Sequence, residues 1–467
     1  MLLTEVVEES STAFKSCYFS HREGKMEPLF EEKEVEVEVD LNKRFHFPSE
    51  LVVRRYKDNN IIIYTEGVSW LVVSDEEKKV FDFLLSGGSI AEALAQFEED
   101  NVVNVISQIE AKQFETPIVR QVDENSIYIY LTNNCNERCK HCYMYAGDIK
   151  IEELSPIVWM DILTEYKEYG GKGVTFTGGE VTVYKGFKEV LKKAHDLGLI
   201  VTVLSNGIGW DEKDIAECSS YIDEIQISID GYDRNSYYAV RQFDGFDKAV
   251  DTLIRFSEYG TRTSMAVTPL YDNLEEFIRH FEPFARNIIE KYPQIYIRFN
   301  LELLEGRTVK KNKIDNAEYR RLIKELVERL YPDYYIETFS LNYKGNTIRK
   351  NCGFGEIAIA ANGDIYWCNR IHELTSRWNV LTTGIKKIME LSCEIKLKTD
   401  VDHSTACQNC EVRYICGGDC RMNYLGIEQA DDHIGMWENE CPNGNKEAIF
   451  KKMVLCNEYF YIDLTEE

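Results

Sequence analysis

The stretch SIYIYLTNNCNERCKHCY, residues 126–143, decides how this chain is interpreted. Its first seven residues form a short apolar run typical of a buried strand. Cys135, Cys139 and Cys142 follow at C-x3-C-x2-C spacing. Three thiolates at this spacing can hold three irons of a four-iron cluster, which usually takes four cysteines, so one iron stays open to a small chelating molecule. The alternative is a structural zinc site, although zinc motifs usually bring paired cysteines and a fourth ligand.

Length and composition limit the class of protein. A chain of 467 residues with 12% aromatic residues favours about three folded domains. No stretch approaches the roughly 20 apolar residues of a membrane span, and the N-terminal MLLTEVVEESS carries acidic residues where a signal peptide has basic ones. We therefore expect a cytoplasmic protein. Fourteen cysteines in such a chain indicate thiolate chemistry with metals more than disulfides.

The formal net charge of −26 argues against a nucleic-acid partner, because neutralising phosphates requires a basic surface. The same charge is compatible with a basic peptide partner and with a solvated acidic surface. The charge alone does not choose between these two.

The first 120 residues divide into an arm and a small module. Residues 1–40 end in the acidic alternation EEKEVEVEVD (31–40), which predicts either an edge strand or a poorly ordered arm. Residues 41–122 then predict short strands at 51–58, 61–67 and 70–74 and a helix opened by a capping box between Ser74 and Glu77. Ser89 can cap a second helix, and residues 101–114 have the apolar spacing of a third.

Three small strands and three short helices predict a winged helix-turn-helix. DNA binding is the obvious function of that fold, but residues 41–120 contain nine Lys and Arg against thirteen Asp and Glu. Peptide binding by adding a strand to the wing is the interpretation that we favour. An inert packing domain is the remaining alternative.

Strand and helix signals alternate over residues 123–335. The expected strands are 126–132, 173–177, 199–205, 224–230, 262–268 and 295–303, and the expected helices are 155–169, 185–197, 212–219, 245–259, 273–290 and 315–330. This alternation predicts an α/β fold in which a parallel sheet curls into a partial, TIM-like (β/α)6 barrel. Chemistry then belongs at the C-terminal ends of the strands, where the cysteine run lies.

Small polar motifs follow three of these strands. Gly178, Gly179 and Glu180 can turn tightly, bring carbonyl groups near a ligand and offer a carboxylate to an ammonium group. Further polar groups suited to hydroxyl or carboxylate recognition close the next two strands: Ser205, Asn206, Ser228 and Asp230. Arg241 can pair with a ligand carboxylate or form a surface salt bridge.

The cysteine run and these motifs resemble the radical S-adenosylmethionine (SAM) superfamily. The resemblance implies an enzyme whose barrel cluster cleaves SAM to methionine and a 5′-deoxyadenosyl radical, which abstracts hydrogen from a substrate. It implies that Gly178, Gly179 and Glu180 hold the SAM amino group and that His141 packs beside adenine. Ser205, Asn206, Ser228, Asp230 and Arg241 resemble further SAM contacts. The N-terminal pattern resembles the peptide-recognition element of maturases of ribosomally made peptides.

Seven cysteines in residues 336–467 form a second pattern. Cys352 and Cys368 fit C-x10-G-x4-C, the run from Cys407 to Cys420 fits C-x2-C-x5-C-x3-C, and Cys441 follows. The order resembles the SPASM domain, which carries two auxiliary four-iron clusters and brings the total to three. Family connectivity implies one cluster on Cys352, Cys368 and Cys420, and another on Cys407, Cys410, Cys416 and Cys441. A zinc ribbon explains only the C-x2-C pair.

Two departures from the SPASM pattern bear on function. The residues before Cys352, KGNTIRKN, contain no cysteine, so the first auxiliary cluster either has an open iron or takes Cys393, His372 or His403 as its fourth ligand. Sulfatase-maturing relatives have an Asp base after the cysteine that corresponds to Cys368, whereas this chain has Asn369, which cannot take the proton.

The resulting hypothesis is a radical SAM maturase that cross-links a ribosomally made precursor peptide. Its expected partners are that peptide, bound through its leader by the N-terminal module, and a one-electron reductant such as flavodoxin or ferredoxin. A thioether at a peptide cysteine is the favoured product, while the catalytic base stays unassigned. The alternatives are sulfatase-type protein oxidation and a non-enzymatic iron–sulfur sensor that binds DNA.

Overall fold

The computed structural model describes residues 40–121, 125–331, 347–374, 376–423, 441, 445–455 and 457. Before residue 40 it describes the backbone of four short strands: β1 (Thr12–Phe14), β2 (Phe19–Arg22), β3 (Lys25–Pro28) and β4 (Val35–Val37). β1 pairs antiparallel with β4, and β2 pairs antiparallel with β3. The acidic segment 31–40 therefore contains one short strand, and the side chains of residues 31–39 lie outside the described part of the chain.

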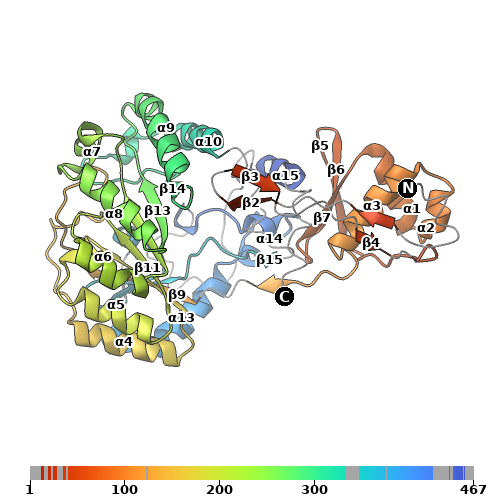
Figure 1. The fold of residues 1–467 in the computed structure, drawn as a ribbon. Helices are drawn as coiled ribbons and strands as arrows, with labels where there is room; N and C mark the ends of the chain where they lie inside the picture. The colour runs from red at the N-terminus through yellow and green to blue at the C-terminus, as the bar shows by residue number, and fades with distance from the viewer. Residues whose placement is uncertain are drawn as a thin grey trace.

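A parallel sheet with helices on its outer face forms one end of the molecule (Figure 1). Its strands, neighbour to neighbour, are β9 (Ser126–Thr132), β10 (Gly173–Gly178), β11 (Ile200–Ser205), β12 (Glu224–Ser228), β13 (Arg262–Val267) and β14 (Tyr296–Phe299). The helices between and after them are α4 (Pro156–Glu168), α5 (Phe187–Asp196), α6 (Glu212–Cys218), α7 (Arg234–Arg241), α8 (Phe246–Glu258), α9 (Leu274–Lys291) and α10 (Asn316–Leu330). The expectation of a parallel α/β fold is confirmed.

The strands of this sheet alternate between two environments. Val174 and Phe176 of β10 are buried in the core between the sheet and the helices. Thr175 and Thr177, which alternate with them along the strand, line a cavity inside the barrel. Successive side chains of a strand point to opposite faces, so the apolar residues face the helices and the polar ones face the interior.

One predicted strand is shorter than expected. The segment 295–303 forms a strand only over Tyr296–Phe299, and the predicted continuation to residue 303 is wrong. Because β14 is the last strand on its side of the sheet, it has one neighbour only, β13. Residues 300–304 instead line the cavity.

The sheet continues past β9 into the C-terminal region, which the sequence did not indicate. β16 (Ile357–Ile359) runs parallel to β9, with Ile357 opposite Ile127. β17 (Asp364–Tyr366) and β18 (Trp378–Asn379) then add antiparallel strands. The largest sheet among the described residues consequently has nine strands, and barrel and C-terminal region share one core.

The N-terminal module has a three-stranded sheet and three helices, as predicted. The strands β5 (Leu51–Tyr56), β6 (Asn59–Tyr64) and β7 (Ser69–Val73) are antiparallel. The helices are α1 (Asp75–Leu85), α2 (Ile90–Leu94) and α3 (Glu99–Ala111). Capping boxes at Ser74 with Glu77 and at Ser89 with Glu92 are both formed.

The module packs closely on the C-terminal region. Ile61, Ile63 and Trp70 of its sheet share a buried cluster with Tyr414 and Met453, and the Trp70 indole Nε1 donates to the Met453 carbonyl at 3.1 Å. The opposite face of the same sheet packs on α1 and α3. Both faces are therefore covered, which explains the continuous apolar run Ile61–Ile63 in β6.

The remaining C-terminal elements lie between module and barrel or beneath the barrel (Figure 1). They are β15 (Thr347–Ile348), which pairs with β8 (Arg120–Gln121), and the helices α12 (Val380–Thr383), α13 (Ile385–Lys398), α14 (Arg413–Cys416) and α15 (Asn445–Leu455). In the described part of the chain no helix combines the length and the apolar character needed to cross a bilayer. The expected domain limits near residues 40, 122 and 335 fall at or within undescribed segments and stay predictions.

Candidate active site

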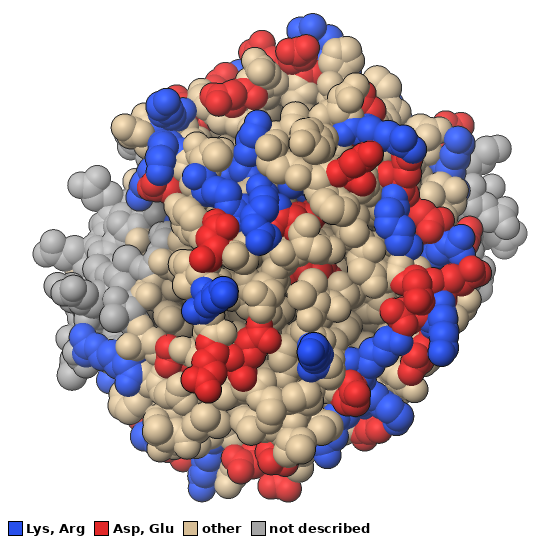
Figure 2. Space-filling model, turned by 90° about the vertical axis from the view of Figure 1, so that its left-hand side faces the viewer, with Lys and Arg blue, Asp and Glu red and all other residues tan. Residues whose placement is uncertain are grey.

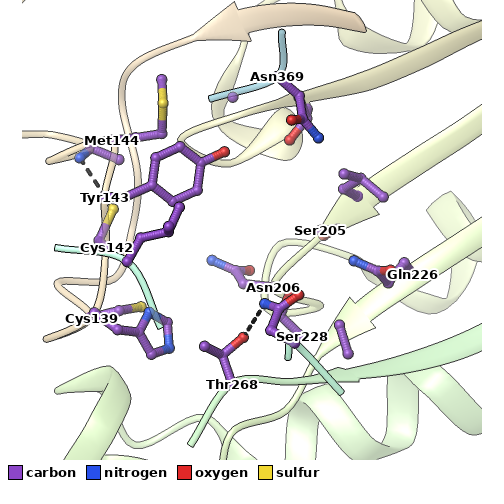
Figure 3. A pocket seen from close by; sticks show the side chains of 18 of the residues that line it. Cys139, Cys142, Tyr143, Met144, Ser205, Asn206, Gln226, Ser228, Thr268 and Asn369 are labelled. Atoms are coloured by element: carbon purple, nitrogen blue, oxygen red, sulfur yellow. Dashed lines mark hydrogen bonds between the residues drawn. The ribbon is translucent and has the colours of Figure 1, made fainter. Parts of the chain in front are cut away.

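A cavity of about 920 Å³ lies inside the barrel and reaches the C-terminal ends of its strands. Figure 3 shows Cys142, Tyr143 and Met144 on one side of it and Ser205 and Gln226 on the other. The lining includes these residues singled out in the sequence: Cys135, Cys139, His141, Cys142, Gly178, Gly179, Glu180, Ser205, Asn206, Ser228 and Arg241. Asp230 lies just behind the wall, in contact with His141 and Arg241.

The cavity wall combines uncharged polar side chains with both acidic and basic ones. Thr175, Thr202, Gln226 and Thr268 present hydroxyl and amide groups to it. Figure 2 shows acidic and basic side chains intermingled on the face that it presents. The excess negative charge of the chain therefore forms no continuous acidic patch among the described residues of that face.

The cysteine loop has the donor set that an iron–sulfur cluster needs. The backbone N–H of Glu137 donates to Cys135 Sγ and that of Ala146 donates to Cys142 Sγ, each at 3.4 Å. Hydrogen bonds of this kind favour a thiolate sulfur and help to set the potential of a cluster. The three residues thus fit a four-iron cluster with one open iron.

Burial makes two of these thiols, Cys135 and Cys139, harder to deprotonate than a free cysteine because it raises their pKa. It raises the pKa of Cys135 to about 11 and also raises the pKa of Cys139. A coordinated metal removes the proton from a thiol, so loading iron here releases protons. Among the described residues no three cysteine, histidine or acidic side chains converge as the ligands of one ion would; the cysteines of a cluster bind separate irons and do not need to converge.

Gly178 and Gly179 let β10 end directly against the cysteine loop. Gly178 has φ +142, and a Cβ there would lie 2.4 Å from the Thr132 carbonyl oxygen. A Cβ on Gly179 would lie 2.1 Å from the Asn134 oxygen. The Gly179 N–H donates to Thr132 and the Glu180 N–H donates to Asn134. A side chain at either glycine would push the loop away.

Glu180 connects the ends of two neighbouring strands. Its buried carboxylate accepts from the Asn206 N–H at 2.7 Å, from Ser205 Oγ at 2.8 Å and from Thr182 Oγ1 at 2.9 Å. Burial raises the pKa of Glu180, and these donors act in the opposite direction. Asn206 in turn donates through Nδ2 to Asn136 Oδ1 at 2.6 Å, which links the end of β11 to the cysteine loop.

A buried charge network, not anticipated from the sequence, locks the cysteine loop to α7. The Arg241 guanidinium donates to Glu137 at 2.9 Å and to Asp230 at 2.7–2.8 Å. His141 Nε2 lies 2.7 Å from Asp230, and Tyr237 donates to Glu137 at 2.7 Å. Burial raises the pKa of Asp230, but the charges of Arg241 and His141 outweigh it and lower that pKa to about 2.

This network gives Arg241 and His141 contacts that differ from the expected ones. The sequence leaves Arg241 either a SAM carboxylate or a surface salt bridge as its partner, and its recorded partners are two buried protein carboxylates. His141 was expected beside adenine, and its ring contacts Asp230. Both residues line the cavity, so a SAM contact stays a prediction for each. Glu137 was not singled out as a site residue from the sequence, although an acidic residue between Cys135 and Cys139 could have indicated it.

Arg307 is a second residue that the sequence did not single out. Its guanidinium donates to the carbonyls of Cys139 at 2.7 Å and Ala146 at 2.8 Å. The Thr308 N–H donates to the Lys140 carbonyl at 2.9 Å. The segment after β14 therefore closes over the cysteine loop from outside. A lone arginine in a loop carries no sequence signal for such a role.

The structure brings Cys352, Cys368 and Cys420 together at the barrel rim. A hydrogen bond with the Cys420 thiol is the largest effect that lowers the pKa of Cys352. Cys368 Sγ donates to Asn369 Oδ1 at 3.5 Å, and Arg370 Nη1 lies 3.7 Å from Cys420 Sγ. Asn369 and Arg370 also line the barrel cavity, so this group of cysteines borders the candidate active site.

The contacts described for the three candidate fourth ligands of this group single out none of them. Cys393 is exposed on α13. His403 Nδ1 lies 2.8 Å from Asp400, and the His372 ring packs on Tyr143 with 4.5 Å between ring centroids. None of these recorded contacts involves Cys352, Cys368 or Cys420.

The other four cysteines line a separate small pocket beside α14. They are Cys407, Cys410, Cys416 and Cys441. Burial raises the pKa of Cys416, and the neighbouring Cys407, Cys410 and Cys441 raise it further. The structure thus separates the seven C-terminal cysteines into a group of three and a group of four.

Comparisons with known proteins agree with this geometry. The profile of the radical SAM superfamily matches residues 129–283. The sporulation killing factor maturation protein SkfB of Bacillus subtilis is 34% identical over 153 residues, 32% of this chain and 37% of its own length. An S-adenosylmethionine-dependent nucleotide dehydratase of Flammeovirga pacifica is 27% identical over 36% of this chain and 63% of its own. The chain thus spans less than two thirds of the length of these relatives.

Two further comparisons cover more of the chain. The mycofactocin maturase MftC of Mycolicibacterium smegmatis is 28% identical over 62% of this chain and 76% of its own. The structure of anSMEcpe with bound AdoMet is 16% identical, covers 72% of this chain and 98% of its own, and superposes with a TM-score of 0.55. At that identity the likeness concerns the fold alone. Radical SAM domains carry a 4Fe–4S cluster and bind SAM, which the cysteine loop and the cavity accommodate. Residues 129–283 of this chain form a radical SAM domain, a member of that superfamily of enzymes.

Proposed function

We propose that this chain is a radical SAM maturase that modifies a ribosomally made precursor peptide in the cytoplasm. The observation that carries the proposal is the position of Cys135, Cys139 and Cys142 on one wall of a cavity of about 920 Å³ that Asn369 and Arg370 of the C-terminal region help to line. A barrel cluster and a C-terminal cysteine group thus border the same space.

The bound cluster would supply the electron that cleaves SAM to methionine and a 5′-deoxyadenosyl radical. The protein holds the cysteine loop through Asn206, Arg307 and the Glu137–Arg241 pair. The cavity wall shields the reacting groups from water. A reductant such as flavodoxin or ferredoxin is the proposed source of the electron.

The C-terminal cysteines are the proposed ligands of two auxiliary clusters. Cys352, Cys368 and Cys420 would hold the first, and Cys407, Cys410, Cys416 and Cys441 the second. The grouping of three and four in the structure supports this assignment. Thiols in each group lie close enough to affect one another's pKa.

A peptide substrate is favoured by the relatives and by the N-terminal module. SkfB and MftC are described as a maturation protein and a maturase, and anSMEcpe has been solved with a bound peptide. The module contains an antiparallel sheet with which a peptide strand can pair. We propose that the module binds the leader of the precursor peptide.

One edge of the module's sheet is closed to a further strand. Gln108 of α3 accepts from the Val72 N–H at 3.0 Å and donates to the Val72 carbonyl at 2.9 Å. Lys112 Nζ donates to the Trp70 carbonyl at 2.7 Å. These side chains occupy backbone groups that an added strand would need at β7.

The opposite edge, on β5, is the proposed peptide site. β5 and β6 are joined by a two-residue turn, so Tyr56 and Asn59 exchange backbone hydrogen bonds. In an antiparallel pair such residues alternate with residues whose N–H and C=O groups point away from the partner strand. Val53 is one of the latter, so its backbone groups point away from β6. Among the strands that the structure describes, β5 pairs with β6 alone. Val53 is exposed there. Its carbonyl accepts from Arg54 Nη1 at 3.1 Å, an exposed contact that a pairing strand would displace.

The first cysteine group favours a thioether product. With three described cysteines near the cavity, a fourth iron position is left for a substrate thiolate, whose pKa would fall on coordination. The thiolate would be held close to the substrate radical. Asn369 cannot act as a base, which disfavours sulfatase-type oxidation.

Anaerobic SAM cleavage tests the proposal. Reconstituted protein with dithionite as reductant should produce 5′-deoxyadenosine, and replacing Cys135, Cys139 and Cys142 with Ala should abolish it while leaving the C-terminal iron. Cleavage at the wild-type rate by the triple variant would refute the barrel site. Replacing the exposed Cys393 instead is the matched control, since it removes a thiol without touching the loop.

A further inference from the structure

Arg421 is a completely buried cation at the centre of the C-terminal cysteine region. It directly follows Cys420, and its side chain has no exposed surface. The guanidinium donates to the carbonyls of Thr399 at 2.7 Å, Asp419 at 2.6 Å, Gly417 at 3.1 Å and Lys350 at 3.2 Å. These carbonyls orient the guanidinium and leave its formal charge unchanged.

The turn before Arg421 is shaped to receive it. Gly417 and Gly418 have φ angles of +71° and +75°, where residues with side chains are strained. A Cβ on Gly418 would lie 2.5 Å from Arg421 Nη1. The two glycines therefore let the chain from Cys416 to Cys420 close tightly around the guanidinium.

The position of Arg421 places its charge near both cysteine groups. Its guanidinium donates to the carbonyl of Gly417, which follows Cys416, and to that of Asp419, which precedes Cys420. The charged groups around it include Cys352, Cys407, Asp400 and Cys416. Cys352 belongs to the group of three, whereas Cys407 and Cys416 belong to the group of four. The backbone N–H of Arg421 also hydrogen-bonds to Cys352. One side chain thus influences ligands of both proposed auxiliary clusters.

We propose that Arg421 is a shared positioning residue whose buried charge raises the reduction potential of both auxiliary clusters. Reducing a cluster adds a negative charge, and a fixed cation nearby stabilises the reduced form more than the oxidised form. The effect is large because no water screens the guanidinium. This inference rests on the proposed presence of the two auxiliary clusters.

The test is a redox titration of full-length, anaerobically reconstituted protein, followed by EPR. Arg421→Gln removes the charge and Arg421→Lys keeps it. We expect both auxiliary potentials to become more negative in the Gln variant and to stay near the wild-type values in the Lys variant. Unchanged potentials in a fully loaded Gln variant, or a shift of one cluster alone, would overturn the shared role.

Arg349 provides the matched control. It is exposed and packs near Gly417 on the outside of the same turn, so Arg349→Gln removes the same charge from a solvated site. Its potentials should match those of the wild type. An equal shift in this variant would show that overall charge, not the buried position, sets the potentials.

Iron retention keeps the inference testable if Arg421→Gln loads poorly. The Gln variant should then lose its auxiliary iron to a chelator several-fold faster than the wild type, while Arg421→Lys retains it. If the Gln and Lys variants lose auxiliary iron at equal rates, Arg421 acts through its hydrogen bonds and not through its charge, and the inference is overturned. Wild-type protein with only about four irons per chain would instead refute the auxiliary clusters themselves.

Discussion

Glu137, inside the cysteine loop, lies 2.9 Å from the Arg241 guanidinium, and both side chains are almost completely buried. The pair joins the loop that presents Cys135 and Cys139 to the helix that follows β12. Removing one partner of a buried pair leaves the other charge without compensation, which is far more destabilising than losing an exposed pair.

The first prediction concerns this pair. Glu137→Ala should destabilise the protein by about 3 to 5 kcal/mol and weaken SAM binding, because the cysteine loop loses its contacts with Tyr237 and Arg241 of α7. Thermal unfolding and calorimetric SAM titration measure the two effects. Glu217→Ala, which breaks the partly exposed pair with Lys188, is the control and should change little. Equal effects of both variants would contradict the proposed importance of the buried pair.

The second prediction assigns iron to the two C-terminal cysteine groups. Replacing Cys352 and Cys368 with Ala should remove about four of about twelve irons per chain, and replacing Cys407 and Cys410 should remove a different four. Iron analysis with EPR distinguishes the two losses. A wild-type chain that binds zinc in place of the auxiliary iron would show that this region is a zinc module.

The third prediction is that Cys393 is no ligand. Because no contact recorded among the described residues links Cys393 of α13 to Cys352, Cys368 or Cys420, Cys393→Ala should retain the full iron content, the auxiliary EPR signals and SAM cleavage. Cys368→Ala is the positive control for loss of the first cluster. The loss of one cluster's iron from the Cys393 variant would identify this residue as the fourth ligand and remove the reason to expect a substrate thiolate there.

The fourth prediction separates the two edges of the module. Val53→Pro removes an outward N–H of β5 and should weaken binding of a labelled cognate precursor peptide at least tenfold, while Val53→Thr, which keeps that N–H, should not. Gln108→Leu should lower stability and leave peptide affinity intact. Fluorescence anisotropy measures binding, and loss of binding in the Gln108 variant alone would move the peptide to β7.

The sequence was informative wherever a local pattern had one physical meaning. The cysteine spacing, the strand-ending Gly178–Glu180 and the capping box at Ser74 all depend on short-range geometry, and the elements around them were predicted closely. Helix α7 was missed because its segment, RNSYYAVR, is short and largely polar, and its buried side includes the charged residue Arg241 beside Tyr237 and Val240. Its capping box between Asp233 and Ser236 lacks the usual Glu or Gln.

Long-range features escaped the sequence analysis. The Glu137–Arg241 pair joins residues 104 positions apart, and Arg307 meets the cysteine loop across 168 positions. The parallel pairing of β16 with β9 also leaves no local signal, because Ile357–Ile359 reads as any short apolar strand. Such contacts depend on how the elements assemble.

The pairing of β16 with β9 has a consequence for dissecting the protein. A radical SAM domain cut out after α10 would present backbone N–H and C=O groups of β9 to solvent, on a largely apolar strand. Uncovered strands of that kind recruit other chains and promote aggregation. The C-terminal region therefore also protects the edge of β9 from pairing with other chains. Production of the barrel alone in soluble form should require retaining residues 357–379 or placing charged residues along β9.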